Sequence, residues 1–341
     1  MAIPRIIVGR GIRLGEGVVL DSNPDFAYGE ESYTTPGTYS WIAPANVTSV
    51  CVVCIGGGGR GETGVNNNAP LDGYRYGGGG GGLGWKNNIP VTPGQSYVVT
   101  VGVGGGRDPD GGGYNPINGG DSYFINTNTV AGLGGKLGGV GGSYVGDGGG
   151  NGGTGSAAPW NSSYTRHVGG GAGGGAGGYT GDGGNSGFID FNSTVAYPTS
   201  GQGGGAAGGW SDLHFENYRD DTFGAGPGGS GVGILGQGSS GNYWNGVDYT
   251  GGIIQNWGYV PDHPGYGGSG GNLGGIGVFL RPPNPNAYYM KGGDGGNYGG
   301  GGGAIGPWWT SPVVDLPGFG GNGAVRIIWG PSRSFPDNAQ P

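Results

Sequence analysis

The sequence predicts an all-β protein: a jelly-roll-like β-sandwich with a long glycine-rich insertion that forms packed polyglycine II helices and loops, and almost no α-helix. Three observations support this fold class. Glycine accounts for 98 of 341 residues and interrupts every window in which an α-helix could form. Short segments rich in β-branched and aromatic residues lie on both sides of the glycine-rich region. Aromatic residues make up 11% of the chain and can supply the buried area that glycine lacks.

The composition argues against several classes of protein. Collagen has glycine at every third position, whereas runs such as Gly77 to Gly82 break any such period. Disordered chains combine few aromatic residues with a high net charge. This chain has 11% aromatic residues, and its net charge of −8 is spread over 341 residues. Its 14 Lys and Arg residues are spread along the chain, so we expect no nucleic-acid partner. No stretch reaches the roughly 18 apolar residues of a membrane span, so we expect none.

Residues 1–31 form a distinct N-terminal segment without glycine runs. Arg5, Arg10 and Arg13 interrupt its apolar residues, so the segment lacks the continuous apolar core of a signal peptide. We interpret it as a segment that anchors the chain to a larger assembly, and a mobile terminus is the alternative.

The predicted sandwich occupies residues 32–135. Residues 32–44 contain two short strands around a turn at Pro36 and Gly37. Residues 47–55 predict a third strand, which is apolar on both faces and therefore needs a cover on both sides. Its alternating residues are Val50, Val52 and Cys54 on one face and Cys51, Val53 and Ile55 on the other.

The sandwich continues with residues 83–91 and 95–103, which flank Pro93 and Gly94 and predict a hairpin. Residues 121–126 give a sixth short strand. The last strand lies much later in the chain, where residues 320–330 complete the sandwich, with Val325, Ile327 and Trp329 on one face. Residues 331–341 are expected to be a C-terminal tail.

The insertion, residues 136–319, alternates glycine runs with aromatic residues. Residues 169–178 precede Tyr179, and residues 201–209 precede Trp210. An extended left-handed helix rises about 3.1 Å per residue and has no internal hydrogen bonds, so its amides must bond to neighbouring helices. Only glycine lets backbones approach closely on every side, so we expect a packed lattice of polyglycine helices. Flexible glycine loops are the alternative.

Two motifs favour structural rather than chemical roles. Cys51 and Cys54 lie three positions apart on a strand, so their side chains point to opposite faces and we expect buried free thiols. The sequence Gly-Asp-Gly-Gly-Asn occurs at 181–185 and 293–297, with a near match at 147–151. Calcium-binding repeats are tandem, whereas these copies are dispersed. We therefore interpret their Asp and Asn residues as turn residues and expect no metal.

The sequence contains no recognisable catalytic motif. His167, His214 and His263 lie in three different loop regions. No nucleophile-elbow sequence accompanies them. Acidic pairs such as Asp220 and Asp221 are more often solvated loop residues than glycosidase carboxylates. We therefore expect no catalytic residue, no cofactor and no enzymatic activity.

Aromatic residues in polar loops are the candidate binding residues. Recognition loops favour Tyr, Ser, Gly and Asn with Trp at the strongest contacts, because rigid rings give contact area at low entropic cost. Packing of the same rings between glycine layers and sandwich is the alternative. The candidates are Trp160, Tyr164, Trp210, Tyr243, Trp244, Trp257, Tyr259, Tyr288, Tyr289, Trp308 and Trp309.

Several of these segments resemble a known family. Residues 33–41 (YTTPGTYSW), 47–50 (VTSV), 91–95 (VTPGQ) and 323–329 (GAVRIIW) resemble the glycine-rich domain of bacteriophage structural and tail proteins, especially in phages of marine cyanobacteria. The stretch Ile3-Pro4-Arg5 is similar to the short leader of several such proteins. The insertion is similar only in composition to phage tail-fibre adhesins, in which polyglycine helices hold variable loops at a distal tip.

The resemblance implies a virion protein on the particle surface, attached to other tail, fibre or capsid proteins through the N-terminal segment. The adhesin comparison implies that the aromatic loops bind host cell-surface glycan. A purely architectural decoration or connector protein is the alternative, and a polysaccharide hydrolase is a third and weaker one. The chain can form a homo-oligomer under each of these three interpretations. The resemblance transfers no catalytic residue.

Overall fold

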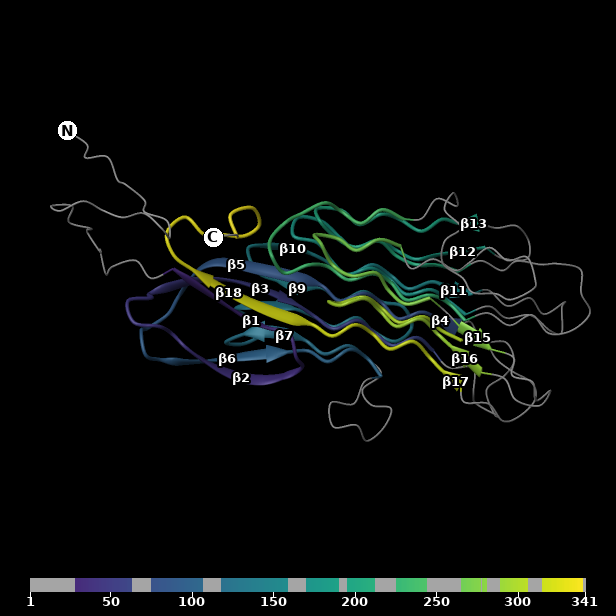
Figure 1. The fold of residues 1–341 in the computed structure, drawn as a ribbon, viewed down its shortest axis with the longest axis horizontal. Helices are drawn as coiled ribbons and strands as arrows, with labels where there is room; N and C mark the ends of the chain where they lie inside the picture. The colour runs from purple at the N-terminus through teal and green to yellow at the C-terminus, as the bar shows by residue number, and fades with distance from the viewer. Residues whose placement is uncertain are drawn as a thin grey trace, which may run out of the picture.

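The computed structural model describes residues 28–62, 75–106, 118–158, 170–189, 195–211, 225–243, 265–276, 278–280, 289–305 and 315–339. These residues contain strands and extended segments and no helix, which confirms the predicted all-β class. The molecule is elongated (Figure 1). A β-sandwich forms one end, and a bundle of glycine-rich segments extends from it to the other end.

Two five-stranded antiparallel sheets form the sandwich, ten strands in place of the eight of a jelly roll. Sheet A has the spatial order β1 (Gly29–Tyr33), β18 (Ala324–Trp329), β3 (Ser49–Ile55), β5 (Leu83–Pro90) and β10 (Gly148–Gly150). Sheet B has the order β2 (Gly37–Ile42), β6 (Ser96–Val101), β7 (Ser122–Phe124), β8 (Val130–Gly132) and β9 (Tyr144–Val145).

The core lies between the two sheets. Trp41 of sheet B is almost fully buried, and its ring lies 5.8 Å from the rings of both Phe124 and Trp329. Side chains of sheet A, including Val52 and Ile327, pack against this aromatic cluster. The core therefore joins residues of the first 130 positions to the last strand, as the sequence predicts.

Strand β3 is covered on both faces, which confirms the expectation from its alternation. Val50, Val52 and Cys54 belong to the core between the sheets, whereas Val53 and Ile55 belong to a second buried cluster on the outer face of sheet A. That second cluster also contains Tyr179, Ala206, Val232, Phe335 and Ala339. The outer cover therefore comes from the glycine-rich region and from the C-terminal segment.

The predicted hairpin around Pro93 and Gly94 is wrong. Strand β5 pairs with β3 and β10, so both of its edges are occupied, and β6 pairs with β2 and β7 in the other sheet. The connection crosses from one sheet to the other, where the Gly94 amide donates to the carbonyl oxygen of Ala43 at 2.8 Å. The turn at Pro36 likewise joins β1 of sheet A to β2 of sheet B.

The glycine runs form a lattice of polyglycine II helices, as expected. The run at 77–82 shows its geometry, because amides three residues apart donate to the same neighbouring run at 2.6 to 3.1 Å. Gly77 and Gly80 donate to Ser156 and Gly153, Gly78 and Gly81 to Gly302 and Gly299, and Gly79 and Gly82 to Lys136 and Leu133. Carbonyl groups of the same run accept amides from three further runs, those of Gly56 and Gly59, of Gly142, and of Gly174 and Gly177. A period of three residues with neighbours in six directions is the packing expected of this helix.

Glycine is required in this lattice because neighbouring backbones are in contact. A Cβ built on Gly80 would overlap the carbonyl oxygen of Gly175, and one on Gly153 would overlap that of Gly184. A larger residue at either position must displace a neighbouring main chain, which cannot move without breaking its own hydrogen bonds.

The lattice is not confined to the expected insertion at 136–319. The runs at 56–61 and 77–82 belong to it, and they continue directly from the end of β3 and into the start of β5. Conversely, β9 and β10 of the sandwich lie beyond residue 135. Sandwich and lattice therefore alternate along the chain and share their hydrogen-bonded segments.

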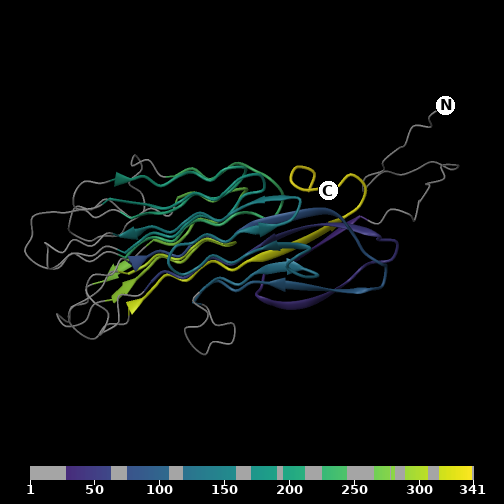
Figure 2. The ribbon, with the colours of Figure 1, turned by 180° about the vertical axis from the view of Figure 1, so that it is seen from behind.

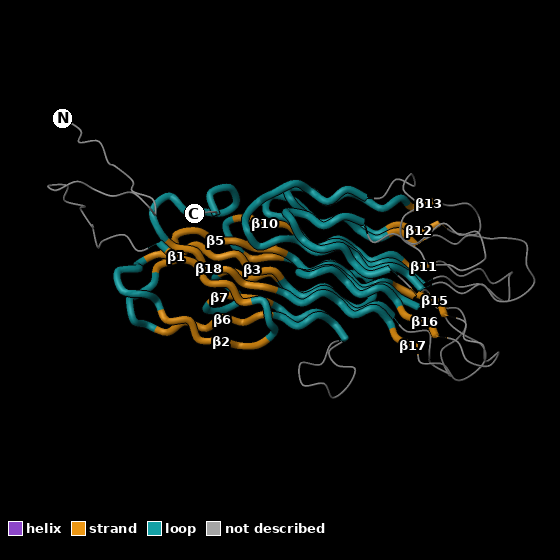
Figure 3. The backbone as a smooth tube through the Cα atoms, in the orientation of Figure 1, coloured by secondary structure: helices purple, strands orange, loops and turns teal. Residues whose placement is uncertain are grey.

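Eight further strands of two or three residues end the lattice on the side away from the sandwich (Figures 1 and 3). They form three small sheets, of which two contain a parallel pair. They are β4 (Arg75–Tyr76), β11 (Ala157–Ala158), β12 (Gly187–Ile189), β13 (Val195–Ala196), β14 (Trp210–Ser211), β15 (Val278–Leu280), β16 (Tyr289–Lys291) and β17 (Asp315–Leu316).

Residues of both expected terminal segments pack with sheet A, in contrast to the expected boundaries. Gly29 to Glu31, expected in the N-terminal segment, lie in β1. Residues 331–339, expected to be a tail, fold back over the outer face of sheet A. The ring of Phe335 stacks on that of Tyr179, with centroids 5.9 Å apart. Burial of Phe335 and hydrogen bonds of Arg333 hold this segment in place.

Candidate functional site

The lattice end opposite the sandwich collects the described residues that precede and follow most of the aromatic loops (Figure 2). Hydrogen bonds join these residues across distant parts of the sequence. The Glu62 amide donates to the carbonyl oxygen of Tyr76, the Ile305 amide donates to that of Glu62, and Ala225 bridges to Ile305. We call this end of the molecule the distal end.

The predicted binding residues divide into two groups. Trp210 lies in β14 and Tyr289 in β16, in two different small sheets at the distal end, and Tyr243 lies at the end of a described segment. The remaining candidates lie outside the described residues: Trp160, Tyr164, Trp244, Trp257, Tyr259, Tyr288, Trp308 and Trp309. The three histidines, His167, His214 and His263, also lie outside them.

Tyr243 is one of three exposed tyrosines on neighbouring lattice segments. The exposed fraction is 65% for Tyr197, 40% for Tyr243 and 43% for Tyr266. The Tyr243 amide donates to the Ser200 hydroxyl, one helical turn beyond Tyr197, and the Tyr266 amide donates to the carbonyl oxygen of Asn242, each at 3.1 Å. We call these three residues the tyrosine strip. Two of them flank the aromatic segment 244–264 in the sequence.

Uncharged polar side chains and apolar side chains are exposed on the segments of the tyrosine strip and on the segment that follows. Gln202, Ser239 and Asn242 are exposed on the same segments. Leu273 and Ile276, also exposed, lie three residues apart on the segment that follows the turn after Tyr266. Exposed rings beside amide and hydroxyl groups can stack on the apolar face of a sugar and hydrogen-bond its hydroxyl groups.

Sequence reasoning missed Tyr197 and Tyr266. Neither lies in the segments with several clustered aromatic residues from which most candidates come. The available signal was the isolation of each ring beside small or turn-forming residues, in Ala196-Tyr197-Pro198 and Gly265-Tyr266-Gly267.

The Gly-Asp-Gly-Gly-Asn motif has a role that differs from the turns we expected. Asp182 and Asn185 lie one helical turn apart in an extended segment, and their side-chain oxygens accept the amides of Asn151 and Thr154 at 2.7 and 2.8 Å. Asn118 and Asp121 accept the amides of Leu137 and Gly134 in the same way. At the rim of the lattice these side chains replace the carbonyl groups of a missing neighbour. Among the described residues, no three His, Cys, Asp or Glu side chains come together to hold a metal.

The two cysteines are buried free thiols, as expected. Burial raises the pKa of both thiols, and Cys54, in the core between the sheets, is completely enclosed. A thiol with a raised pKa is a poor nucleophile.

An ionic cluster fastens the C-terminal segment to sheet A. The side chains of Arg326 and Arg333 are buried, and both donate to Oε2 of Glu30 and to the carbonyl oxygen of Ala339. The hydrogen bond from Arg333, with that from Arg326, holds the pKa of the Glu30 carboxyl below its usual value. Arg326 also donates to the carbonyl oxygen of Ile234, which ties the lattice to the sandwich.

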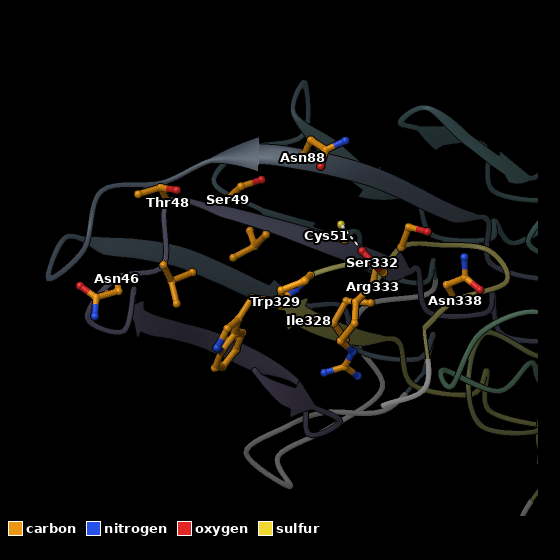
Figure 4. Close-up of a pocket in the computed structure, with 15 residues that line it drawn as sticks. Asn46, Thr48, Ser49, Cys51, Asn88, Ile328, Trp329, Ser332, Arg333 and Asn338 are labelled. Atoms are coloured by element: carbon orange, nitrogen blue, oxygen red, sulfur yellow. Dashed lines mark hydrogen bonds between the residues drawn. The ribbon is translucent and has the colours of Figure 1, made fainter. Parts of the chain in front are cut away.

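A cleft of about 580 Å³ lies at the sandwich end, where β18 leaves β3 (Figure 4). Its lining contains Asn46, Thr48, Asn88 and Asn338, and the Cys51 thiol donates to the carbonyl oxygen of Arg333 at 3.4 Å. Among the described residues no carboxylate lines it, and the Arg333 guanidinium is bonded to Glu30. Of the predicted binding residues that the structure describes, Trp210, Tyr243 and Tyr289, none lines this cleft.

The described part of the chain contains no helix long and apolar enough to cross a membrane. No curated protein matches the sequence. The family model for the glycine-rich domain matches residues 34–234, which is more than half of the chain and includes strands of both sheets and much of the lattice. On this match, the chain belongs to the glycine-rich domain family.

Proposed function

We propose that this chain is a virion structural protein of a bacteriophage, and that it acts as a tail or tail-fibre tip adhesin that contributes to recognition of host cell-surface glycan. The observation that carries the proposal is the tyrosine strip, three exposed rings on neighbouring lattice segments, two of which flank the aromatic segment 244–264 in the sequence. The resemblance of the sandwich segments to phage structural proteins supports the virion assignment.

The lattice supports the proposal because its interior tolerates few substitutions, whereas the distal end and the rim can vary in sequence. At most of the lattice glycines an added Cβ would overlap a neighbouring main chain, so substitution there is destabilising. The distal end and the rim lack this restriction. A receptor-binding protein needs such an arrangement, in which a rigid body presents loops that can change without affecting the fold.

In this proposal the chain attaches to the particle at the sandwich end, opposite the distal end. The N-terminal segment precedes β1 at the sandwich end, so a chain anchored there directs its distal end away from the assembly (Figure 1). Other tail, fibre or capsid proteins are the proposed partners.

The charge pattern favours binding over hydrolysis. Glycosidases need a carboxyl group whose pKa is raised so that it can act as an acid. In the described part of the chain, the carboxyl groups with shifted pKa values are Glu30 and Asp147, and both are shifted downward. Each is bonded to a basic side chain, Asp147 to Lys86 at 2.7 Å.

The experiment that tests the proposal is paired replacement of Tyr243 and Trp244 by alanine, with binding to host cells and the melting temperature measured on the same preparations. We expect at least about tenfold weaker binding and a nearly unchanged melting temperature, because the Tyr243 ring is exposed. Tyr28→Ala, at an exposed tyrosine of the sandwich end, is the matched control and should bind normally.

Two results would overturn this assignment. Loss of stability in proportion to lost binding would favour packing of the rings against the body. Full-length protein that binds no host cell or glycan but still incorporates into particles would favour the architectural alternative.

A further inference from the structure

The outer face of sheet B differs from that of sheet A. Sheet A is covered by the lattice and the C-terminal segment, whereas the outward residues of β2 and β6 are largely exposed. Ile42 is 61% exposed and Val98 44% exposed. The outward residues of β2, β6 and β7 are Thr38, Ser40, Ile42, Ser96, Val98, Thr100 and Tyr123, and none of them is acidic or basic.

The hydroxyl groups on this face bond to one another across the strands. Thr38 bonds to Thr100 at 3.3 Å, and Ser40 bonds to Ser96 at 2.5 Å. A polar group that keeps a hydrogen-bond partner loses little when water is removed. The face can therefore be buried with a small desolvation penalty, and Ile42 and Val98 gain from burial.

We propose that two copies of this chain associate face to face through the outer surface of sheet B. The choice of a second copy follows from charge. The chain has a net charge of −8, so two copies repel each other through most of their surfaces. A twofold interface places the same patch on both partners, and a patch without charged residues is complementary to itself.

The size of the face sets the strength of this association. Strands β2 and β6 have six residues each, β7 and β8 have three each and β9 has two, so strands about 4.8 Å apart with about 3.4 Å per residue give a face of about 330 Å². Two copies would bury about 650 Å² in total, which is in the range of weak, transient contacts. The dimer is therefore reversible, with the two sheets packed at about −30°.

Sedimentation of the full-length chain tests this interface. The average mass should rise from 33.7 kDa toward twice that value as the protein concentration increases from about 10 µM to about 1 mM. Val98→Lys places two like charges in the interface and should weaken association at least about tenfold. Val98→Thr, which keeps the face uncharged, should weaken association much less than Val98→Lys.

Val140→Lys is the matched control, because Val140 is an exposed valine (59%) that bonds to Lys136 in the lattice and belongs to no strand of sheet B. It should leave association unchanged. If Val98→Lys fails to fold, Ile42→Lys on the same face replaces it. A chain that remains monomeric at about 1 mM, or a dimer that Val98→Lys and Ile42→Lys both leave intact, would overturn the proposal. The proposal does not depend on the adhesin assignment.

Discussion

Gly173 donates its amide hydrogen to the carbonyl oxygen of Pro227 at 2.9 Å, and a Cβ on Gly173 would overlap the carbonyl oxygen of Gly301. We therefore expect Gly173→Ala to destabilise the protein by about 3 kcal/mol or more, because a neighbouring main chain must move. Gly209→Ala is the control, since its Cβ would lie 3.1 Å from the nearest atom. Thermal unfolding of both variants measures the difference, and equal melting temperatures would mean that the lattice is not packed as described.

Side-chain caps at the lattice rim give a second prediction. Asp182→Ala removes the acceptor of the Asn151 amide and should accelerate hydrogen exchange at that amide, with a loss of about 1 kcal/mol in stability. Asp182→Asn keeps an acceptor oxygen and should retain most of the protection. Unchanged exchange at Asn151 in Asp182→Ala would show that the carboxylate does not replace a lattice neighbour.

The Glu30 cluster predicts a loss of stability in acid. Because the pKa of Glu30 is lowered in the folded state, its contribution is present above the unfolded pKa of about 4.3 and is lost as the pH falls through the lower folded-state pKa. Glu30→Gln leaves two buried guanidinium groups without their carboxylate, so it should destabilise the protein at neutral pH and flatten the melting profile below about pH 5.

Glu62→Gln removes the same charge without contact to Arg326 or Arg333 and is the control for this profile. If Glu30→Gln and the original chain lost stability in parallel between about pH 5 and pH 3, the cluster would not be the acid-sensitive element.

The buried thiols give a fourth prediction. Neither Cys51 nor Cys54 should react with a thiol reagent in the native protein, because burial raises both pKa values. Both should react once the protein is unfolded. Rapid labelling of Cys54 under native conditions would contradict its place in the core between the sheets.

The sequence predicts the strands of the sandwich well, because alternation leaves a clear signal. In β3, six alternating apolar residues predict a strand covered on both faces, and the structure confirms both covers. The three-residue period of the lattice also follows from glycine chemistry. The lattice neighbours of Gly80 could not be predicted, since glycine runs carry no side chains that specify a partner.

Connections and rim residues were harder to predict. A Pro-Gly turn such as Pro93-Gly94 can connect two strands of a hairpin or two strands of different sheets. The pairing partners of β5 determine which connection forms, and the turn sequence does not specify them. Asp182 and Asn185 have turn propensity, but their role depends on an empty neighbouring position in the lattice. Tyr197 and Tyr266 were missed because their exposure is set by adjacent glycine segments rather than by a loop sequence.

Competition with infection is the most direct test of the proposed adhesin role. Purified full-length chain is added to susceptible bacteria, cyanobacteria first, before a phage that carries it, and adsorption of the phage is measured against concentration. We predict that the chain binds the cells and reduces adsorption, and that the Tyr243→Ala/Trp244→Ala double variant does so at least about tenfold less effectively. Binding that is absent, or adsorption that stays unchanged at saturating protein, would contradict it.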